Sequence, residues 1–339
     1  MGVNELAYRA ATSPVGRRVV ESLATRVAMP FGEAPSTATR RLRVVVTIDT
    51  EGGYVAKGER RIWQGQAPDA FQGYEHGIRN TLAVLDRHGV KGTFLVAPHG
   101  LSARGATLAA VERSILSIPR GGHEIGLHLH PTSDRALAAR VGASFAHGSA
   151  RYLELTEVRR LVIAGRALLT EVLGPAVPSL VSFRWGNWGL DERAARIVAE
   201  AGFDIDSSAV PGMRDRKRAA AAPDRPRFDW SARRSMEPWE IAPGLLELPI
   251  ATFRCLGRLL RADPLYGPLL VAALERYRAC APTFVVMTHS TEATHRDGSP
   301  TRALADLDAF LARACSLGDV EIVTLRQAAT GVSRVTSEE

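Results

Sequence analysis

Residues 47–51 read TIDTE and residues 122–131 read GHEIGLHLHP, and these two stretches carry the clearest signal in the chain. In each stretch, the side chains that could bind a metal or carry a proton lie two positions apart: Asp49 and Glu51 in the first, His128 and His130 in the second. Side chains of a β-strand point alternately to its two faces, so the members of each pair leave the strand on the same side. Carboxylates and imidazoles are the ligands that zinc and related divalent ions prefer. Two carboxylates and two imidazoles could therefore converge on one point.

Strand-like apolar runs alternate with helical patterns from residue 42 onward. This alternation is typical of βα units and of a mainly parallel sheet, so the predicted fold class is α/β. We expect strands at residues 44–49, 90–96, 123–130, 180–184, 202–208, 246–250, 283–289 and 320–325, and helices at 74–88, 156–173, 191–201, 265–280 and 301–316. Thr156 and Asp191 are the expected N-caps of two of these helices. The stretch 213–238 is predicted to be a long loop.

Residues 1–40 precede this pattern and are predicted to form a helical extension. Apolar residues recur there at helical spacing, with arginines opposite them: Val15, Val19, Val20, Leu23 and Val27. Pro30 ends the pattern. Such an amphipathic helix could lie at a membrane surface or dock on its own barrel, and we expect docking.

The composition is that of a soluble globular protein. Of its 339 residues, 45% are hydrophobic and 23% are charged, and no apolar run approaches the ~20 residues that a membrane span needs. The chain begins without a basic region followed by an apolar core, so no export signal is expected. Its three cysteines, Cys255, Cys280 and Cys315, show no short paired spacing and are expected to be reduced core thiols. We expect a cytoplasmic protein.

The net charge is +7, and positive charge gathers in residues 9–43 and 213–234. Either segment could meet phosphate or an anionic membrane surface, and a solvated basic surface is the alternative. Peripheral contact with the inner membrane face through the N-terminal helix therefore stays open. Nucleic-acid binding is not expected, because the basic residues lack an interleaved aromatic pattern. The oligomeric state is not predicted.

Taken in order, the motifs over most of residues 42–326 resemble the polysaccharide deacetylase family, which is carbohydrate esterase family 4 or the NodB-homology superfamily. The first motif of that family usually reads TFDDG, in which the first Asp is the general base and the second a metal ligand. Here the second acid stands one place later, at Glu51, as in an acid-x-acid branch of the superfamily. With this shift, the side chains of Glu51 and Asp49 lie on the same face of the strand. The resemblance implies that Asp49 is the base, and that one divalent metal ion, expected to be zinc, is held by Glu51, His128 and His130.

Two later motifs supply the other expected site residues. Residues 183–189 read FRWGNWG and resemble the motif whose arginine holds the base carboxylate, which here is Arg184. Asn187 and Trp188 are expected to contact the substrate, although Trp188 could instead be a core or lid residue. His289 lies in the run VVMTHS at residues 285–290 and matches the general acid of the family, whereas taken alone it would be read as a core histidine.

The remaining histidines are given lesser roles. His123 is expected to be structural, and His295 is a weaker candidate for the catalytic pocket. We expect the rest at the surface: His76, His88, His99 and His147.

The resemblance implies a distorted (β/α) barrel of seven or eight mainly parallel strands over residues 41–330, followed by a disordered tail at 331–339. The implied activity is metal-dependent removal of an N-acyl group, expected to be N-acetyl, from an amino sugar in a saccharide, nucleotide sugar or lipid-linked glycan. Asp49 would take a proton from water and His289 would protonate the leaving amine. One alternative is a non-carbohydrate amidase or deformylase that uses the same site. The other is a non-catalytic carbohydrate-binding protein with a decayed site.

Overall fold

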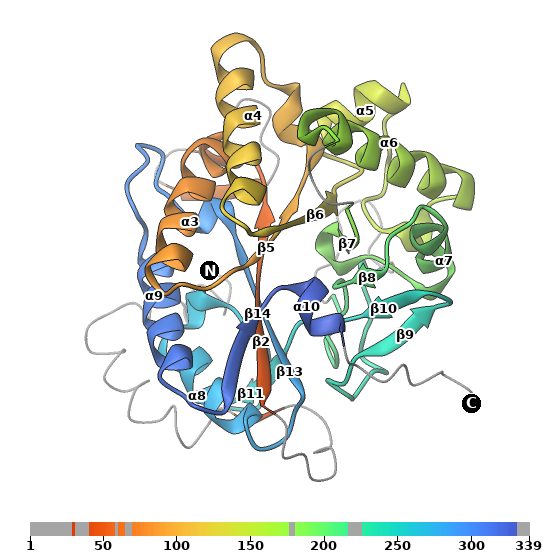
Figure 1. The fold of residues 1–339 in the computed structure, drawn as a ribbon. Helices are drawn as coiled ribbons and strands as arrows, with labels where there is room; N and C mark the ends of the chain where they lie inside the picture. Colours follow the sequence, from red (N-terminus) through yellow and green to blue (C-terminus); the bar gives the residue numbers. More distant parts are fainter. Residues whose placement is uncertain are drawn as a thin grey trace.

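The computed structural model describes residues 29–30, 41–57, 60–64, 70–175, 180–215 and 226–330. In this part of the chain, seven neighbouring strands run parallel in one curled sheet (Figure 1). Their order is β13 (Thr283–His289), β2 (Leu42–Thr50), β5 (Thr93–Val96), β6 (Glu124–Leu129), β7 (Ser182–Trp185), β8 (Ile205–Asp206) and β10 (Leu245–Glu247). A parallel bridge between Ile250 and Val285 joins the two ends of this series. The distorted barrel that the motifs implied is confirmed.

Two further strands complete this sheet. β14 (Val320–Val323) pairs in parallel with the first half of β2, and β5 pairs with the second half. β9 (Trp239–Ala242) pairs antiparallel with β10. β2 is therefore hydrogen-bonded to neighbours along its whole length, and its side chains are almost entirely buried.

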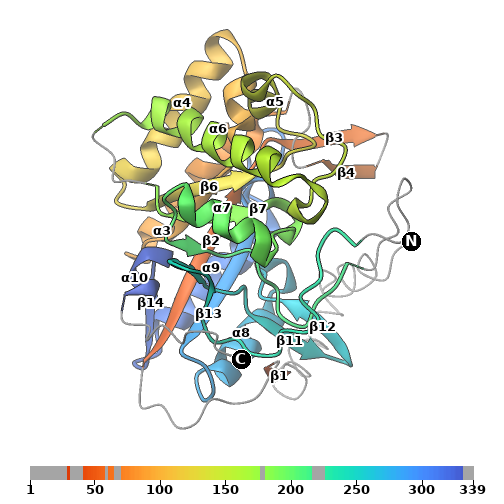
Figure 2. The same cartoon turned by 90° about the vertical axis from the view of Figure 1, so that its right-hand side faces the viewer.

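Helices lie around the outside of the sheet, as the two perpendicular views show (Figures 1 and 2). They are α3 (Ile78–Arg87), α4 (Gly105–Arg120), α5 (Arg135–Val141), α6 (Leu155–Leu173), α7 (Glu192–Glu200), α8 (Pro268–Tyr277), α9 (Arg302–Cys315) and α10 (Leu325–Ala329). Each long helix buries one apolar stripe; α9, for example, buries Leu307, Phe310 and Leu311. Phe310 stacks on Phe284 of β13, so the core is continuous between this helix and the sheet.

All eight predicted strands and all five predicted helices are present; β13 has the predicted bounds, and the others have shifted ends. The helix predicted at 74–88 begins as a π-helical turn, η1 (Gly73–Gly77). Asp191 caps α7 as predicted, but the N-cap of α6 is Glu154 and not Thr156. Glu154 and Glu157 form a capping box there, in which each side chain accepts a hydrogen bond from the other residue's backbone N–H.

The prediction omitted α4, α5, α10, β9 and two hairpins. The hairpins are β3 (Gly53–Lys57) with β4 (Arg60–Gln64), and β11 (Thr252–Cys255) with β12 (Arg258–Arg261). β1 (Met29–Pro30) pairs antiparallel with β11. The other residues of the predicted extension 1–40 and of the tail 331–339 lie outside the described part of the chain, so both stay predictions.

Three smaller expectations can also be checked. The described residues of the loop 213–238 form no helix or strand beyond an isolated bridge between Arg214 and Asp229. Among the described residues, no helix has both the length and the apolar character to cross a membrane. All three cysteines are free thiols, but Cys315 is exposed, so it is not a core residue.

Candidate active site

The strand register brings the predicted site residues to one rim of the barrel. His289 of β13 lies opposite Asp49 of β2, and His128 of β6 lies opposite Arg184 of β7. Parallel barrels place their active sites at this rim, where the carboxyl ends of the strands meet. Six predicted residues gather there, all buried: Asp49, Glu51, His128, His130, Arg184 and His289.

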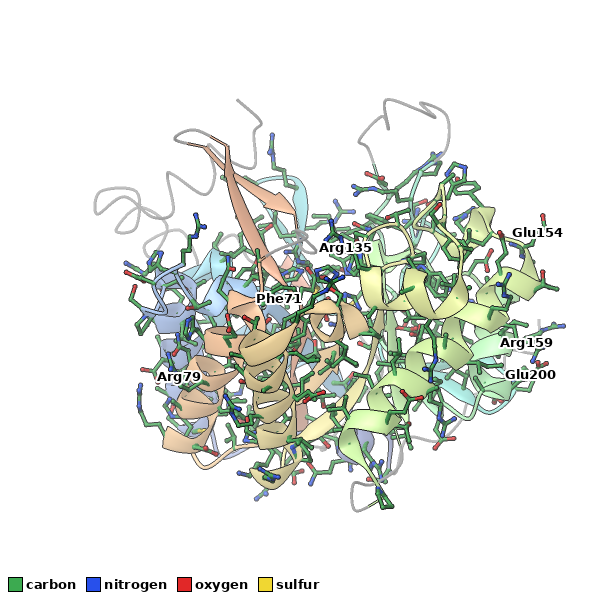
Figure 3. The ribbon with its side chains drawn as sticks, turned by 90° about the horizontal axis from the view of Figure 1, so that it is seen from above. Phe71, Arg79, Arg135, Glu154, Arg159 and Glu200 are labelled. Atoms are coloured by element: carbon green, nitrogen blue, oxygen red, sulfur yellow. The ribbon has the colours of Figure 1, made fainter. Side chains whose placement is uncertain are left out.

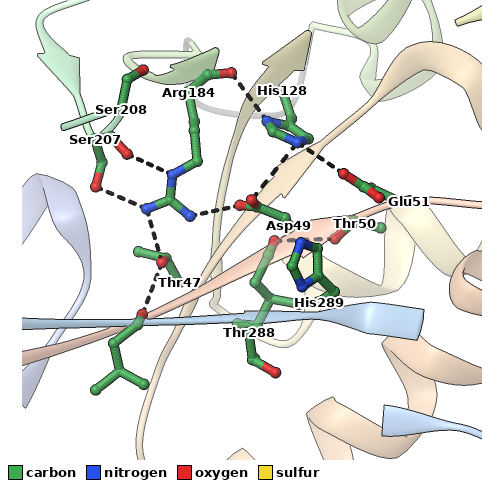
Figure 4. Close-up of polar contacts among 12 residues, drawn as sticks. Thr47, Asp49, Thr50, Glu51, His128, Arg184, Ser207, Ser208, Thr288 and His289 are labelled. Carbon is green, nitrogen blue, oxygen red and sulfur yellow. Dashed lines mark hydrogen bonds and ion pairs between the residues drawn. The ribbon is translucent and has the colours of Figure 1, made fainter. Parts of the chain in front are cut away.

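Three ligand atoms converge within this group, on Glu51, His128 and His130, and Figure 4 shows the first two of these residues facing each other. Glu51 Oε1 lies 2.8 Å from His130 Nε2 and 3.1 Å from His128 Nε2, and the two Nε2 atoms are 3.0 Å apart. His128 Nδ1 donates a hydrogen bond to the Arg184 carbonyl oxygen at 3.1 Å, which leaves a lone pair on His128 Nε2. That lone pair faces another imidazole nitrogen and a carboxylate oxygen, and Glu51 Oε2 is buried without a hydrogen-bond partner among the described residues. A divalent cation among these atoms would relieve their repulsion, so the donor set fits the implied metal.

Glu51 is ionised, as a metal ligand must be. Burial alone would raise the pKa of its carboxyl group, but protons on the imidazoles of His130 and His128, whose place a bound cation would take, hold that pKa well below the usual value. Gly186 shapes the same site, because a Cβ at this position would lie 2.6 Å from the His130 ring. The glycine therefore lets the ring reach its place beside Glu51.

Arg184 holds Asp49 from the side away from the ligands. Its Nη1 donates to Asp49 Oδ1 at 2.6 Å, and both side chains are buried. Nε donates to the Ser207 carbonyl at 2.6 Å, while Nη2 donates to Thr47 Oγ1 at 3.0 Å and to Ser207 Oγ at 2.8 Å (Figure 4). Burial would raise the pKa of Asp49, but the Arg184 guanidinium, together with His128 and His289, lowers that pKa. Asp49 is thus a fixed carboxylate whose Oδ2 lies 3.7 Å from His128 Nε2.

Removing the guanidinium should destabilise the fold. We expect Arg184→Met to lower the free energy of unfolding by about 3–5 kcal/mol, because it leaves the buried Asp49 carboxylate without its partner. Urea unfolding measures this loss. Arg159→Met is the control: it breaks the exposed Arg159–Glu200 ion pair and should cost less than about 1 kcal/mol. Equal losses in the two variants would contradict the buried ion pair.

His289 has an acidic partner that the sequence analysis missed. Its Nδ1 lies 3.1 Å from Glu292 Oε1, and its backbone N–H donates to Glu292 Oε2 at 3.0 Å. Burial would lower the pKa of His289, but Glu292, Glu51 and Asp49 together raise it to about 9. The imidazole therefore carries a proton at neutral pH. An acid three positions after a strand-ending residue is a capping-box pattern, which could have pointed to Glu292.

Asn187 and Trp188 lie just past β7 in an uncommon backbone conformation, with φ of 53° and 55°. Asn187 Oδ1 accepts a hydrogen bond from Arg227 Nη1 at 3.2 Å. The half-buried Trp188 ring packs edge-on against Phe228, and the guanidinium carbon of Arg261 lies 5.2 Å from its centroid. Protein groups thus cover part of both side chains, and their contact with a substrate stays a prediction.

His99 is not the surface residue that we expected. It is fully buried, its Nδ1 accepts a hydrogen bond from the Arg135 backbone N–H at 3.3 Å, and its ring stacks on Phe71 with centroids 5.7 Å apart. His88 is also partly covered, since 15% of its side chain is exposed and its Nε2 lies 2.6 Å from Asp308. His123 is buried and accepts a hydrogen bond from the Gly92 backbone N–H, which agrees with a structural role.

Comparison with known proteins reveals similarity at the level of structure. No protein-family model and no curated protein matches the sequence. A "putative polysaccharide deacetylase from Mycobacterium smegmatis" superposes with a TM-score of 0.59 and 22% identity, covering 89% of this chain and 94% of that one. The Puue allantoinase gives 0.56 and 14% identity, with 89% and 95% covered. A "probable polysaccharide deacetylase from Pseudomonas aeruginosa PAO1" gives 0.52 and 17% identity, with 86% and 90% covered. This chain therefore has the NodB-like fold of the polysaccharide deacetylases, as its motifs implied.

Proposed function

We propose that the protein is a metal-dependent hydrolase that removes an N-acyl group from an amino sugar. The acyl group that we propose first is acetyl. The convergence of Glu51, His128 and His130 beside the ion-paired Asp49 carries the proposal. Burying two imidazoles and two carboxylates side by side is costly, and a cation bound among them would lower that cost. The fold shared with polysaccharide deacetylases supports this assignment.

The three ligands would hold one divalent ion, for which we propose zinc. When bound, such an ion supplies Lewis acidity, which polarises a carbonyl group and makes water more acidic. Asp49 is ionised and directs Oδ2 toward the ligand atoms, so it can take the proton of an attacking water. Arg184 keeps that carboxylate charged and oriented. His289 holds a proton at neutral pH and can pass it to the departing amine.

The pH dependence of turnover should report His289. Because the imidazole must carry its proton, we expect kcat/KM of the metal-loaded enzyme to fall as the pH rises through about 9. In Glu292→Gln the neighbouring charge that raises this pKa is gone, so the alkaline limb should move toward the ordinary histidine value of about 6.5. Glu200→Gln, at an exposed position, is the control. An alkaline limb that stays in place in Glu292→Gln would contradict the role of this pair.

The function is tested by measuring acid release from a panel of amides with the metal-loaded protein. Hydrolysis of N-acetylated amino sugars, in preference to linear and cyclic amides without a sugar, would support the proposal. The reverse preference would favour a non-carbohydrate amidase, the class suggested by the similarity to an allantoinase fold. Saccharide binding without hydrolysis of any amide would favour the non-catalytic alternative.

A further inference from the structure

A cavity of about 840 Å³ lies between the segment around Phe71 and the beginnings of α4 and α5. Three of its lining side chains are arginines, Arg104, Arg135 and Arg140, and none is acidic. Its volume falls within the range of small-molecule sites. The mechanism proposed above uses none of these residues.

The cavity offers positive charge and hydrogen-bond donors. Arg104 is the residue before α4, a helix with no acidic residue in its first turn and no side-chain cap, so its first N–H groups remain available. No acidic side chain of the described residues pairs with Arg104, whereas Arg140 pairs with Glu171. Ser102 Oγ is buried and has no hydrogen-bond partner among the residues that the structure describes. Together, these groups suit a ligand with several anionic oxygens.

An aromatic ring stands beside the arginines. Phe71 and Arg135 lie side by side near the middle of the molecule when it is seen from above (Figure 3). One face of Phe71 stacks on the buried His99, which holds the ring in place. Phe71 and Arg104 also line a second cavity of about 410 Å³, so these two residues belong to the walls of both. A flat apolar surface next to guanidinium groups suits a sugar ring or a base attached to a phosphate.

Backbone contacts tie the cavity walls to the metal ligands. Phe71 comes two residues before Gly73, where a Cβ would collide with the Glu51 carbonyl oxygen. On the other wall, Arg135 follows a turn in which the Asp134 backbone N–H donates to the His130 carbonyl at 3.0 Å. The segments that form the cavity walls are therefore held directly against the segments that carry the metal ligands.

We propose that this cavity binds a phosphate or diphosphate group of the substrate, so that the favoured substrates are phosphorylated N-acyl amino sugars and not neutral saccharides. The substrate part of this inference rests on the proposed function. A soluble nucleotide sugar and a lipid-linked sugar diphosphate both carry the diphosphate group that the cavity would bind.

The anion site is tested first without catalysis, by titrating inorganic pyrophosphate into metal-loaded protein in a calorimeter. We expect Arg104→Gln,Arg135→Gln to weaken binding by about tenfold or more, because two charge-assisted contacts are lost. The control Arg159→Gln,Arg313→Gln removes the same charge from exposed positions on α6 and α9 and should bind as the wild type does. Arg159 lies at the far edge of the molecule in Figure 3. Equal binding by all three proteins would overturn the inference.

The substrate class is tested by comparing kcat/KM for uridine diphosphate N-acetylglucosamine, a polyprenyl diphosphate N-acetylglucosamine in detergent micelles, and neutral diacetylchitobiose. We expect the Arg104→Gln,Arg135→Gln variant to raise KM for a diphosphate substrate and to leave kcat near that of the wild type. If only one of the two diphosphate substrates is hydrolysed, the result shows whether the favoured substrate is a soluble nucleotide sugar or a lipid-linked sugar. Equal activity on the neutral sugar, unchanged in the variant, would overturn the inference while the proposed function stands. If the protein hydrolysed none of the three substrates but the variant lost pyrophosphate binding, the proposed function would be refuted and the anion site would be supported.

Discussion

The purified protein is expected to carry about one equivalent of a divalent metal ion, and His128→Ala,His130→Ala should carry none and have no measurable activity. Three buried ligand atoms converge in the wild type, and the double variant leaves only Glu51. Because the ion binds the folded state, chelation should also lower the melting temperature of the wild type. Elemental analysis and thermal unfolding with and without chelator measure both effects.

The control for this experiment replaces a histidine at the end of α3, His88→Ala, whose partner is Asp308, and should keep the metal. Retention of the ion by His128→Ala,His130→Ala would place the metal elsewhere. A wild type without metal after reconstitution, and with no change on chelation, would favour the non-catalytic alternative.

Asp49→Asn is expected to lower kcat by about 10²- to 10⁴-fold, the usual contribution of a general base, and to leave the metal content unchanged. Asparagine has the same shape and can still accept the Arg184 hydrogen bond through its side-chain oxygen, but it cannot take up a proton under these conditions. The ligand atoms of Glu51, His128 and His130 are untouched. Single-turnover kinetics and metal analysis of the same preparation separate the two roles.

The control Asp319→Asn removes an exposed carboxylate that pairs with Arg278, and it should keep the wild-type kcat. If Asp49→Asn lost its metal as well as its activity, Asp49 would be a ligand. Wild-type turnover in Asp49→Asn would refute the base assignment altogether.

The alternating faces of β-strands were enough to predict the convergence of Asp49 with Glu51 and of His128 with His130. Parity alone places each pair on one side of its strand, and the βα alternation places both strands in the same sheet. The usual motif has its second acid, a metal ligand, at the position that Thr50 occupies here. Because Glu51 shares a strand face with Asp49 and Thr50 does not, Glu51 could be predicted as the ligand instead. The family resemblance added Arg184 and His289, which lie far along the chain from the two opening stretches.

Contacts made only through the folded chain could not be predicted in this way. Thr47 and Ser207 hold Arg184, yet a threonine or serine at a strand end has many ordinary roles. The arginine cavity is assembled from segments that have no motif of their own. The short helix α5 escaped notice because seven residues are too few for a clear helical period. The N-cap of α6 was misplaced because Glu154 is a less usual cap than Thr156.

The central position of β2 affects how the site forms during folding. Thr47 Oγ1 donates a hydrogen bond to the carbonyl oxygen of Val286, and these two residues are 239 positions apart in the chain. The strand that carries Asp49 and Glu51 is thus synthesised early but gains its β13 neighbour only when the last fifth of the domain has emerged from the ribosome. Such long-range pairing closes slowly, because the loop entropy must be overcome before the contact forms. Until then one edge of this apolar strand lacks its β13 neighbour, and this is the interval in which a chaperone would matter most to the yield of active protein.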